Sequence, residues 1–187
     1  MLTDKRVIKT RAGIKTALMQ LTLEKEIGKI TISNLTEKAQ INRSTFYLHY
    51  SSVADVTDDI EKEISARISS CINNFNYDDI YGSTCAMFTN LTNVLNENVT
   101  MKNYILNSTS SDYILGRIKE ILVDKTMTAV LAQYPKHKKQ DFAYTFTFLS
   151  AGIIDTYIKW AHSEDNEITL EELIKTVSAL IEKTLIK

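Results

Sequence analysis

Hydrogen-bonding side chains are concentrated between positions 43 and 49, where a guanidinium, two hydroxyls, a phenol and an imidazole follow closely on one another. A guanidinium reaches guanine acceptors or a phosphate, short hydroxyl residues permit close approach, and a phenol or an imidazole donates to phosphate oxygens. A leucine in the same run suits a thymine methyl group. This chemistry favours binding to double-stranded DNA, and the residues expected to make the contacts are Thr31, Arg43, Ser44, Thr45, Tyr47, Leu48 and His49.

A helical conformation would give this run one inward and one outward face. Phe46 and Tyr50 are four residues apart and would share the inward face, whereas Arg43 and Tyr47 fall on the outward arc. A helix of this size fits the major groove of DNA. Phe46 and Tyr50 are therefore expected in the core. For Tyr47 and His49 a purely structural role stays open as the alternative.

Two further helices are expected to position the run. Apolar residues recur at three- and four-residue steps over 4–26, which predicts a first helix that is ended by Gly28. Thr31 provides a cap oxygen for a second helix of about two turns, and the free amides of that N-terminus can also hold a phosphate. Asn42 is a good N-cap for a third helix over 43–50. Two short helices joined by so tight a turn form a helix-turn-helix.

The sequence pattern of the rest of the chain also predicts helices. Capping boxes begin helices at Ser52 and Thr169, and the pattern between them predicts helices over roughly 81–97, 100–107, 111–133 and 138–162, with Pro135 closing one of them. Five Gly and one Pro are few for a sheet protein of 187 residues. We therefore predict an all-α fold of about nine helices, with a helix-turn-helix domain over 1–51 and a helical ligand-binding and dimerisation domain over 52–187.

The charge distribution separates the two predicted parts. Residues 1–50 carry nine Lys or Arg against four Asp or Glu, a net charge of +5, so the remainder carries −6. A basic N-terminal segment followed by an acidic remainder is typical of proteins that neutralise phosphates, although a solvated basic surface without a partner is the alternative.

Several other classes of protein are disfavoured. The N-terminus lacks a long apolar signal segment and no window is apolar enough for a membrane span, so we expect a cytoplasmic protein. Cys71 and Cys85 form no metal-binding or disulfide motif, and we expect no metal and no cofactor. An enzyme is disfavoured because no catalytic motif occurs and His49, His137 and His162 lie on separate elements.

Residues 31–50 closely resemble the helix-turn-helix of the TetR family of bacterial regulators. In that family a Thr caps the second helix, an Ala faces the turn, and the third helix ends in aromatic, Tyr, variable, His, aromatic; here these are Thr31, Ala39 and residues 46–50. The resemblance implies a DNA-binding transcriptional regulator. One departure is Val53, where family members commonly place a phosphate-binding Lys. The cations that could compensate are Lys5, Arg6, Lys9, Lys29 and Lys38.

The segment over 148–160 resembles the eighth helix of short TetR-like proteins, in which the last two helices form a dimer interface. The resemblance implies a homodimer, with a monomer as the alternative; its interface residues would be Phe148, Ala151, Gly152, Ile154, Ile158, Leu173, Val177 and Leu180. It also implies a small-molecule effector that releases a repressor from DNA, bound near Cys71, Met87, Phe88, Tyr104, Tyr113, Arg117 and Tyr144. The competing hypothesis is a TetR-like coactivator or chromosome-associated factor controlled by a protein partner.

Overall fold

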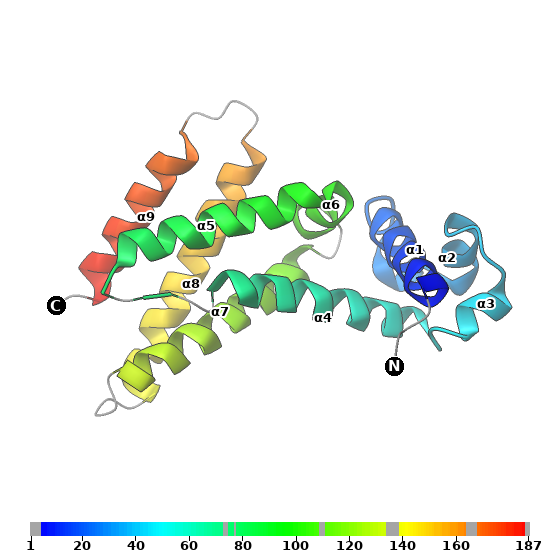
Figure 1. The fold of residues 1–187 in the computed structure, drawn as a ribbon, viewed down its shortest axis with the longest axis horizontal. Coiled ribbons are helices and arrows are strands. Elements are labelled where there is room, and N and C mark those ends of the chain that lie inside the picture. Colours follow the sequence, from blue (N-terminus) through cyan, green and yellow to red (C-terminus); the bar gives the residue numbers. More distant parts are fainter. Residues whose placement is uncertain are drawn as a thin grey trace. The chain divides into compact units, whose positions relative to one another are not determined.

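The computed structural model describes residues 5–72, 75–76, 78–108, 111–133, 139–163 and 168–185, without the side chains of 72, 111–114, 129–130, 133, 139, 141–142 and 185. Within these residues the chain is all-helical, as predicted from the sequence (Figure 1). The helices are α1 (Lys5–Leu21), α2 (Ile32–Lys38), α3 (Arg43–Tyr47), α4 (Val53–Ile72), α5 (Ile80–Glu97), α6 (Val99–Asn107), α7 (Ser111–Gln133), α8 (Lys139–His162) and α9 (Leu170–Leu185), with a 3-10 turn η1 (Ile27–Lys29). Pro135, expected to close a helix, lies outside the described residues.

The chain divides into two compact units. The first comprises residues 1–64 and 95–114, which include α1 to α3, the first part of α4, and α6. The second comprises residues 65–94 and 115–187, which include most of α5 and α7 and all of α8 and α9. Helix α4 therefore contributes to both units. The boundary predicted near residue 51 was placed from the end of the helix-turn-helix and stays a prediction.

The first helix ends earlier than its apolar pattern suggested. It stops at Leu21, and the buried Thr22 donates its hydroxyl proton to the carbonyl of Met19 at 2.8 Å. The prediction of a helix up to residue 26 was wrong because Leu23 is 40% exposed and gives a longer helix no apolar face to bury. Gly28 lies inside the 3-10 turn and does not end the helix.

A tight helix ending joins α2 to α3. Ala39 is the C-cap of α2, and Gln40 adopts a left-handed φ of 54°. Its amide donates to Glu37 O at 3.1 Å, and the next amide, of Ile41, donates to Thr36 O at 3.0 Å. These two bonds form a Schellman motif, which satisfies the last carbonyls of α2 and reverses the chain within two residues. The motif makes the turn that the sequence pattern predicted.

Side-chain caps begin α2, α4 and α9; they form complete capping boxes at α2 and α9, whereas at α4 the Asp55 carboxylate accepts from the amide of Ser51 instead of the N-cap Ser52. At α2 the Thr31 hydroxyl accepts from the amide of Asn34, whose side chain accepts from the amide of Thr31. At α4 the Ser52 hydroxyl accepts from the amide of Asp55 at 3.1 Å. The Thr169 box is formed likewise at α9. The predicted caps at Thr31, Ser52 and Thr169 are therefore confirmed.

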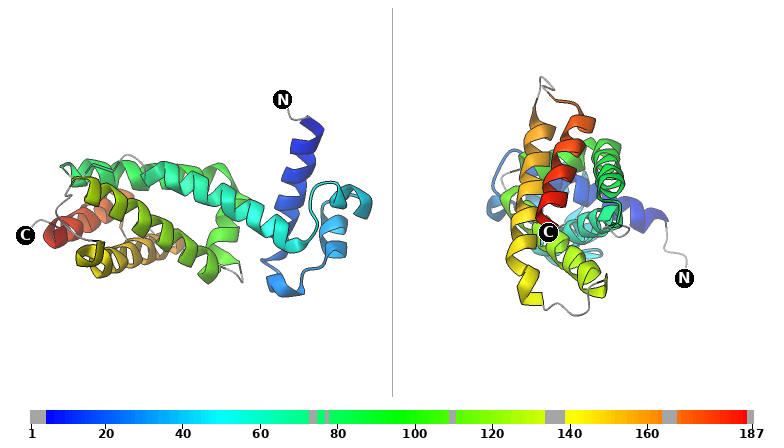
Figure 2. Two further views of the ribbon diagram at one scale, coloured as in Figure 1. Left: turned by 90° about the horizontal axis from the view of Figure 1, so that it is seen from below. Right: turned by 90° about the vertical axis from the view of Figure 1, so that its left-hand side faces the viewer.

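The core of the second unit lies between α5, α8 and α9. Helices α8 and α9 lie side by side (Figures 1 and 2), with Phe146, Leu173 and Val177 buried. The rings of Phe88 on α5 and Tyr157 on α8 are 5.3 Å apart, and the Tyr157 hydroxyl lies 2.9 Å from that of Thr92. No helix among the described residues is long and apolar enough to cross a membrane.

Candidate DNA-binding site

Helix α3 is held to the first unit by its inward aromatic residues. Phe46 is completely buried and Tyr50 is 5% exposed, and their ring centroids lie 6.1 Å apart. Tyr50 lies three residues after the end of α3, and its amide donates to Phe46 O at 3.0 Å. The prediction that these two side chains pack inward is confirmed. The helix is shorter than the predicted 43–50: it ends at Tyr47, and residues 48 and 49 form a turn.

The opposite side of α3 is open to solvent. Tyr47 is 59% exposed and Leu48 is 81% exposed, although both are large and partly apolar. Arg43 and Ser44 are also exposed, and Arg43 donates a hydrogen bond to the Ser33 hydroxyl on α2. Large exposed side chains on a short helix are typical of a binding surface.

The remaining candidates for DNA contact lie at the edges of this face. Thr31 is exposed at the N-terminus of α2, whereas Thr45 and His49 are half-buried. The structure therefore brings the outward arc together as the helical spacing predicted. Whether each of these residues contacts DNA stays a prediction.

A polar cluster joins α1 to α4 behind α3. Oδ2 of Asp59 accepts from the Tyr50 hydroxyl at 2.6 Å and lies 3.1 Å from Nη2 of Arg11 and 3.6 Å from Nζ of Lys15. The Arg11 guanidinium also lies over the Tyr50 ring, 4.9 Å from its centroid. Lys15 forms a second ion pair, with Glu63 at 2.5 Å. Sequence reasoning missed this cluster because its members are up to 52 positions apart, from 11 to 63, and form no motif.

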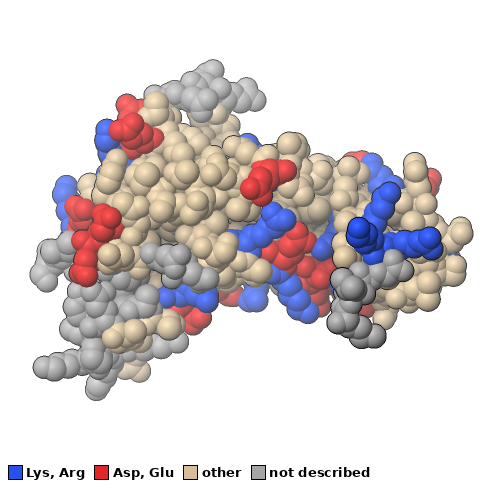
Figure 3. All heavy atoms as spheres, in the orientation of Figure 1, with Lys and Arg blue, Asp and Glu red and all other residues tan. Residues whose placement is uncertain are grey.

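The cations suggested as phosphate contacts differ in their surroundings. Lys29 pairs with Glu26 at 3.1 Å and Lys38 pairs with Glu24 at 3.2 Å, both at the surface. Lys5 and Lys9 are exposed on α1, where Lys and Arg side chains gather on the face shown in Figure 3. Exposed ion pairs are weak and screened by salt, so Lys29 and Lys38 stay available to a phosphate at little cost.

The seven predicted effector-binding residues do not line one described cavity. Tyr104 is fully buried in the core of the first unit, on α6, which packs against α1. Arg117 is exposed and bonded to Glu120 at 2.5 Å, and Tyr144 is 88% exposed. The side chain of Tyr113 lies outside the described part of the structure.

The other three candidates lie in the second unit. Met87 and Phe88 are buried on α5, and Cys71 is half-buried on α4, where burial raises the pKa of its thiol. Phe88 packs against Tyr157, as expected of a core residue. Helical spacing shows which residues share a face, but it does not show whether that face lines a cavity or fills the core.

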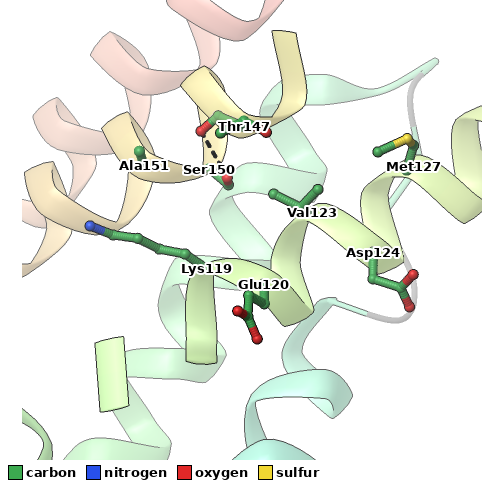
Figure 4. A pocket seen from close by; sticks show the side chains of 8 residues that line it. All are labelled: Lys119, Glu120, Val123, Asp124, Met127, Thr147, Ser150 and Ala151. Carbon is green, nitrogen blue, oxygen red and sulfur yellow. Dashed lines mark hydrogen bonds between the residues drawn. The ribbon is translucent and has the colours of Figure 1, made fainter. Parts of the chain in front are cut away.

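An open hollow of about 420 Å³ lies between α7 and α8 in the second unit (Figure 4). Its lining residues are Lys119, Glu120, Val123, Asp124, Met127, Thr147, Ser150 and Ala151. Val123 and Met127 supply apolar surface, and Lys119 bridges the two helices through an ion pair with Asp155 at 2.7 Å. Sequence reasoning missed the hollow because α7 shows no amphipathic pattern that would mark its inner face.

The predicted dimer interface is divided between surface and core. Phe148 is 73% exposed, Leu180 is 57% exposed and Gly152 is exposed, while Ala151 and Ile158 are half-buried. Three of the predicted residues are instead buried within the chain itself, namely Ile154, Leu173 and Val177. These three side chains have little exposed surface to offer a partner, and the interface itself stays a prediction.

The buried anchor, the exposed arc and the tight turn define a helix-turn-helix DNA-binding protein. Comparison with known proteins identifies its family. A model of TetR C-terminal domains, described as "Transcriptional regulator C-terminal region", matches residues 84–183. The chain therefore belongs to the TetR family of helix-turn-helix transcriptional regulators, which are not enzymes. Regulators of this family bind DNA operators and dimerise.

One curated relative supports the assignment over part of the chain. The "Uncharacterized HTH-type transcriptional regulator YxbF" of Bacillus subtilis (strain 168) is 35% identical over 66 residues. The match covers 35% of this chain and 17% of the length of that relative.

Solved structures show the same fold over nearly the whole chain. A TetR transcriptional regulator from Streptococcus agalactiae 2603V is 23% identical, with a TM-score of 0.62 over 95% of this chain and 96% of that one. The fatty acid degradation regulator FadR from Bacillus halodurans is 16% identical, with a TM-score of 0.61 over the same shares. The dihydroxyacetone kinase operon activator DhaS is 19% identical, with a TM-score of 0.56 over 95% and 97%.

Proposed function

We propose that this chain is a sequence-specific transcriptional repressor that binds its operator as a homodimer and is released by a small-molecule effector. The observation that carries the proposal is the exposed arc of α3, where Arg43, Ser44, Tyr47 and Leu48 face solvent opposite the buried Phe46. An arc of this kind can enter the major groove because its packing side is already satisfied within the unit.

Three side chains of the arc, and His49 at its edge, have proposed roles. Arg43 and Leu48 read base edges, since a guanidinium pairs with guanine and an alkyl group contacts a thymine methyl. Tyr47 and His49 donate to phosphate oxygens, which position the duplex without reading its sequence. The proposal therefore divides the arc into residues that set sequence preference and residues that set affinity for any DNA.

Binding to two kinds of duplex tests this division. Wild-type protein is first used to enrich duplexes from a random library, and a shuffled duplex of the same length serves for comparison. Arg43→Ala and Leu48→Ala should reduce the preference for the enriched duplex, by about 1–3 kcal/mol for a bidentate arginine contact. Tyr47→Ala should weaken binding to both duplexes about equally. Tyr81→Ala, which removes an exposed tyrosine of α5, is the control. Equal effects of all three arc variants on both duplexes would contradict the roles.

The dimer is proposed to form through the exposed sides of α8 and α9. Phe148 and Leu180 expose large apolar surface there, and Gly152 permits close helix approach. Sedimentation equilibrium tests this: Phe148→Asp combined with Leu180→Asp should give monomers. Val99→Asp, which alters an equally exposed apolar residue of α6, should leave the dimer intact. A dimer that persists in the double variant would exclude this surface.

Effector release is proposed from the function of the family together with the hollow between α7 and α8, whose lining of apolar and polar side chains suits a small amphipathic molecule. Because FadR is a regulator of fatty acid degradation, fatty acids belong in the first ligand screen. Thermal shift and DNA binding are measured with each compound. A compound that stabilises the protein and weakens DNA binding supports the proposal.

The second candidate is a DNA-binding activator controlled by a protein partner. It is favoured by the scattered positions of the predicted effector residues, of which Arg117 and Tyr144 face solvent, and by the likeness in fold to DhaS, which is an operon activator. If no compound changes either signal while a co-purifying protein changes DNA binding, this candidate replaces the repressor.

A further inference from the structure

Helix α3, the proposed recognition helix, is too short to hold its own orientation. Helix α3 has five residues, whereas isolated helices shorter than about 12–15 residues are marginal in water. Its buried side chain is Phe46, whose apolar ring makes no hydrogen bond, and Arg43 bonds the start of the helix to Ser33 on α2. A directional bond at the other end of the segment would further restrict rotation of the exposed arc.

Tyr50 provides such a bond. Its ring contacts Phe46, its amide bonds to Phe46 O, and its hydroxyl donates to Asp59 on α4 at 2.6 Å. The end of the recognition segment is thereby tied to α4 by one hydrogen bond to a charged group, the stronger class of hydrogen bond. Arg11 and Lys15 bring α1 to the same carboxylate oxygen.

The protonation states suit this arrangement. Burial opposes the ionisation of Asp59, but hydrogen bonds from Tyr50 and Arg11 outweigh it and hold the pKa of that carboxyl below its ordinary value. Burial and the bond to Asp59 raise the pKa of the Tyr50 phenol, so it stays a donor. The Tyr50–Asp59 bond is therefore a charge-assisted bond at neutral pH.

We propose that Asp59 and Tyr50 are positioning residues for operator reading, which hold α3 in the orientation that places Arg43 and Leu48 against base edges. The proposal rests on the proposed function of α3. Loss of the bond lets α3 populate other orientations. The apparent affinity for DNA then falls in proportion to the fraction of molecules in which α3 keeps the orientation that can bind. Phosphate contacts tolerate such movement better than base contacts do. Specific binding should therefore fall more than non-specific binding.

Tyr50→Phe tests the proposal, because it keeps the ring and removes only the hydroxyl. Affinity is measured for the duplex enriched by wild-type protein and for the shuffled duplex, with thermal unfolding of each variant alongside. We expect the ratio of the two affinities to fall about fivefold, as the loss of one such bond allows. Affinity for the shuffled duplex should change less than about twofold.

Asp59→Asn and a matched control complete the test. Asp59→Asn removes the charge-assisted bond with Tyr50 together with the ion pairs to Arg11 and Lys15, so the double variant with Tyr50→Phe should lose no more specificity than Asp59→Asn alone. Glu63→Gln breaks the neighbouring α1–α4 ion pair without touching Tyr50, and it should leave the ratio unchanged.

Three results would overturn the proposal. The first is an unchanged affinity ratio in Tyr50→Phe, and the second is an equal loss on both duplexes that tracks the loss of thermal stability, which indicates a structural role only. The third is a double variant in which the specificity losses of Tyr50→Phe and Asp59→Asn multiply. A wild-type protein that enriches no duplex defeats the proposed function itself, and this failure is recognised before any variant is made.

Discussion

Replacing Gln40 by glycine should stabilise the helix-turn-helix. Gln40 lies between α2 and α3 and is held at a φ of 54°, where an L-residue brings its Cβ too close to the backbone. Its side chain is exposed, and its backbone amide already donates to Glu37 O. Glycine keeps that bond and is the residue most often found at this position of a Schellman motif.

The expected gain follows from two opposing effects. The left-handed conformation costs an L-residue about 1–2 kcal/mol. Glycine loses more backbone freedom on folding, which costs about 0.5–1 kcal/mol. The net gain for Gln40→Gly is about 0–1.5 kcal/mol, with a midpoint of about 0.75 kcal/mol, and in a chain of this length the midpoint raises Tm by roughly 1.5–3 °C.

Thermal unfolding followed by circular dichroism measures this gain. Gln40→Ala is the matched control, since alanine also lacks the long side chain but keeps the Cβ that causes the strain. We expect the Gly variant to unfold above the wild type and the Ala variant to unfold at or below it. If alanine stabilises as much as glycine, the strain argument fails.

The remaining predictions concern packing, capping and phosphate contacts. Phe46→Ala should cost about 3–5 kcal/mol in urea unfolding, because the ring is fully buried; a loss below about 1 kcal/mol would mean that α3 is anchored elsewhere. Ser52→Ala should cost about 1 kcal/mol through loss of the α4 cap, and an unchanged urea midpoint would contradict this. Lys5→Gln and Lys9→Gln should each reduce the slope of log affinity against log salt by about 2, because a homodimer carries each lysine twice, and unaltered slopes would show that neither contacts a phosphate.

Periodicity and capping signals were sufficient to predict most of the fold. The capping residues Thr31 and Ser52 start their helices as expected, and the spacing of Phe46 and Tyr50 correctly predicted the inward face of α3. These features are local, because a cap or a helix face is decided within a few residues. The end of α1 was missed because Leu23 fits the helical period and yet stays 40% exposed.

The features that depend on tertiary packing could not be predicted. Tyr104 and Tyr144 were both chosen for a ligand site, yet one is fully buried and the other is 88% exposed. Leu173 was assigned to a dimer interface but packs within its own chain. The Asp59 cluster joins residues that are distant in sequence. In each case the outcome depends on which helix faces pack against each other. The helical periodicity of a single sequence does not contain this information.

Chemical protection of guanine N7 tests the central claim most directly, since this atom lies in the major groove. Dimethyl sulfate is applied to the enriched duplex with and without protein. If α3 reads the major groove in a homodimer, guanines should be protected in two half-sites about one helical turn, or a multiple of it, apart, and Arg43→Ala should restore reactivity at one guanine in each half-site. Unprotected guanines on a duplex that is fully bound would show that another surface of the protein binds DNA.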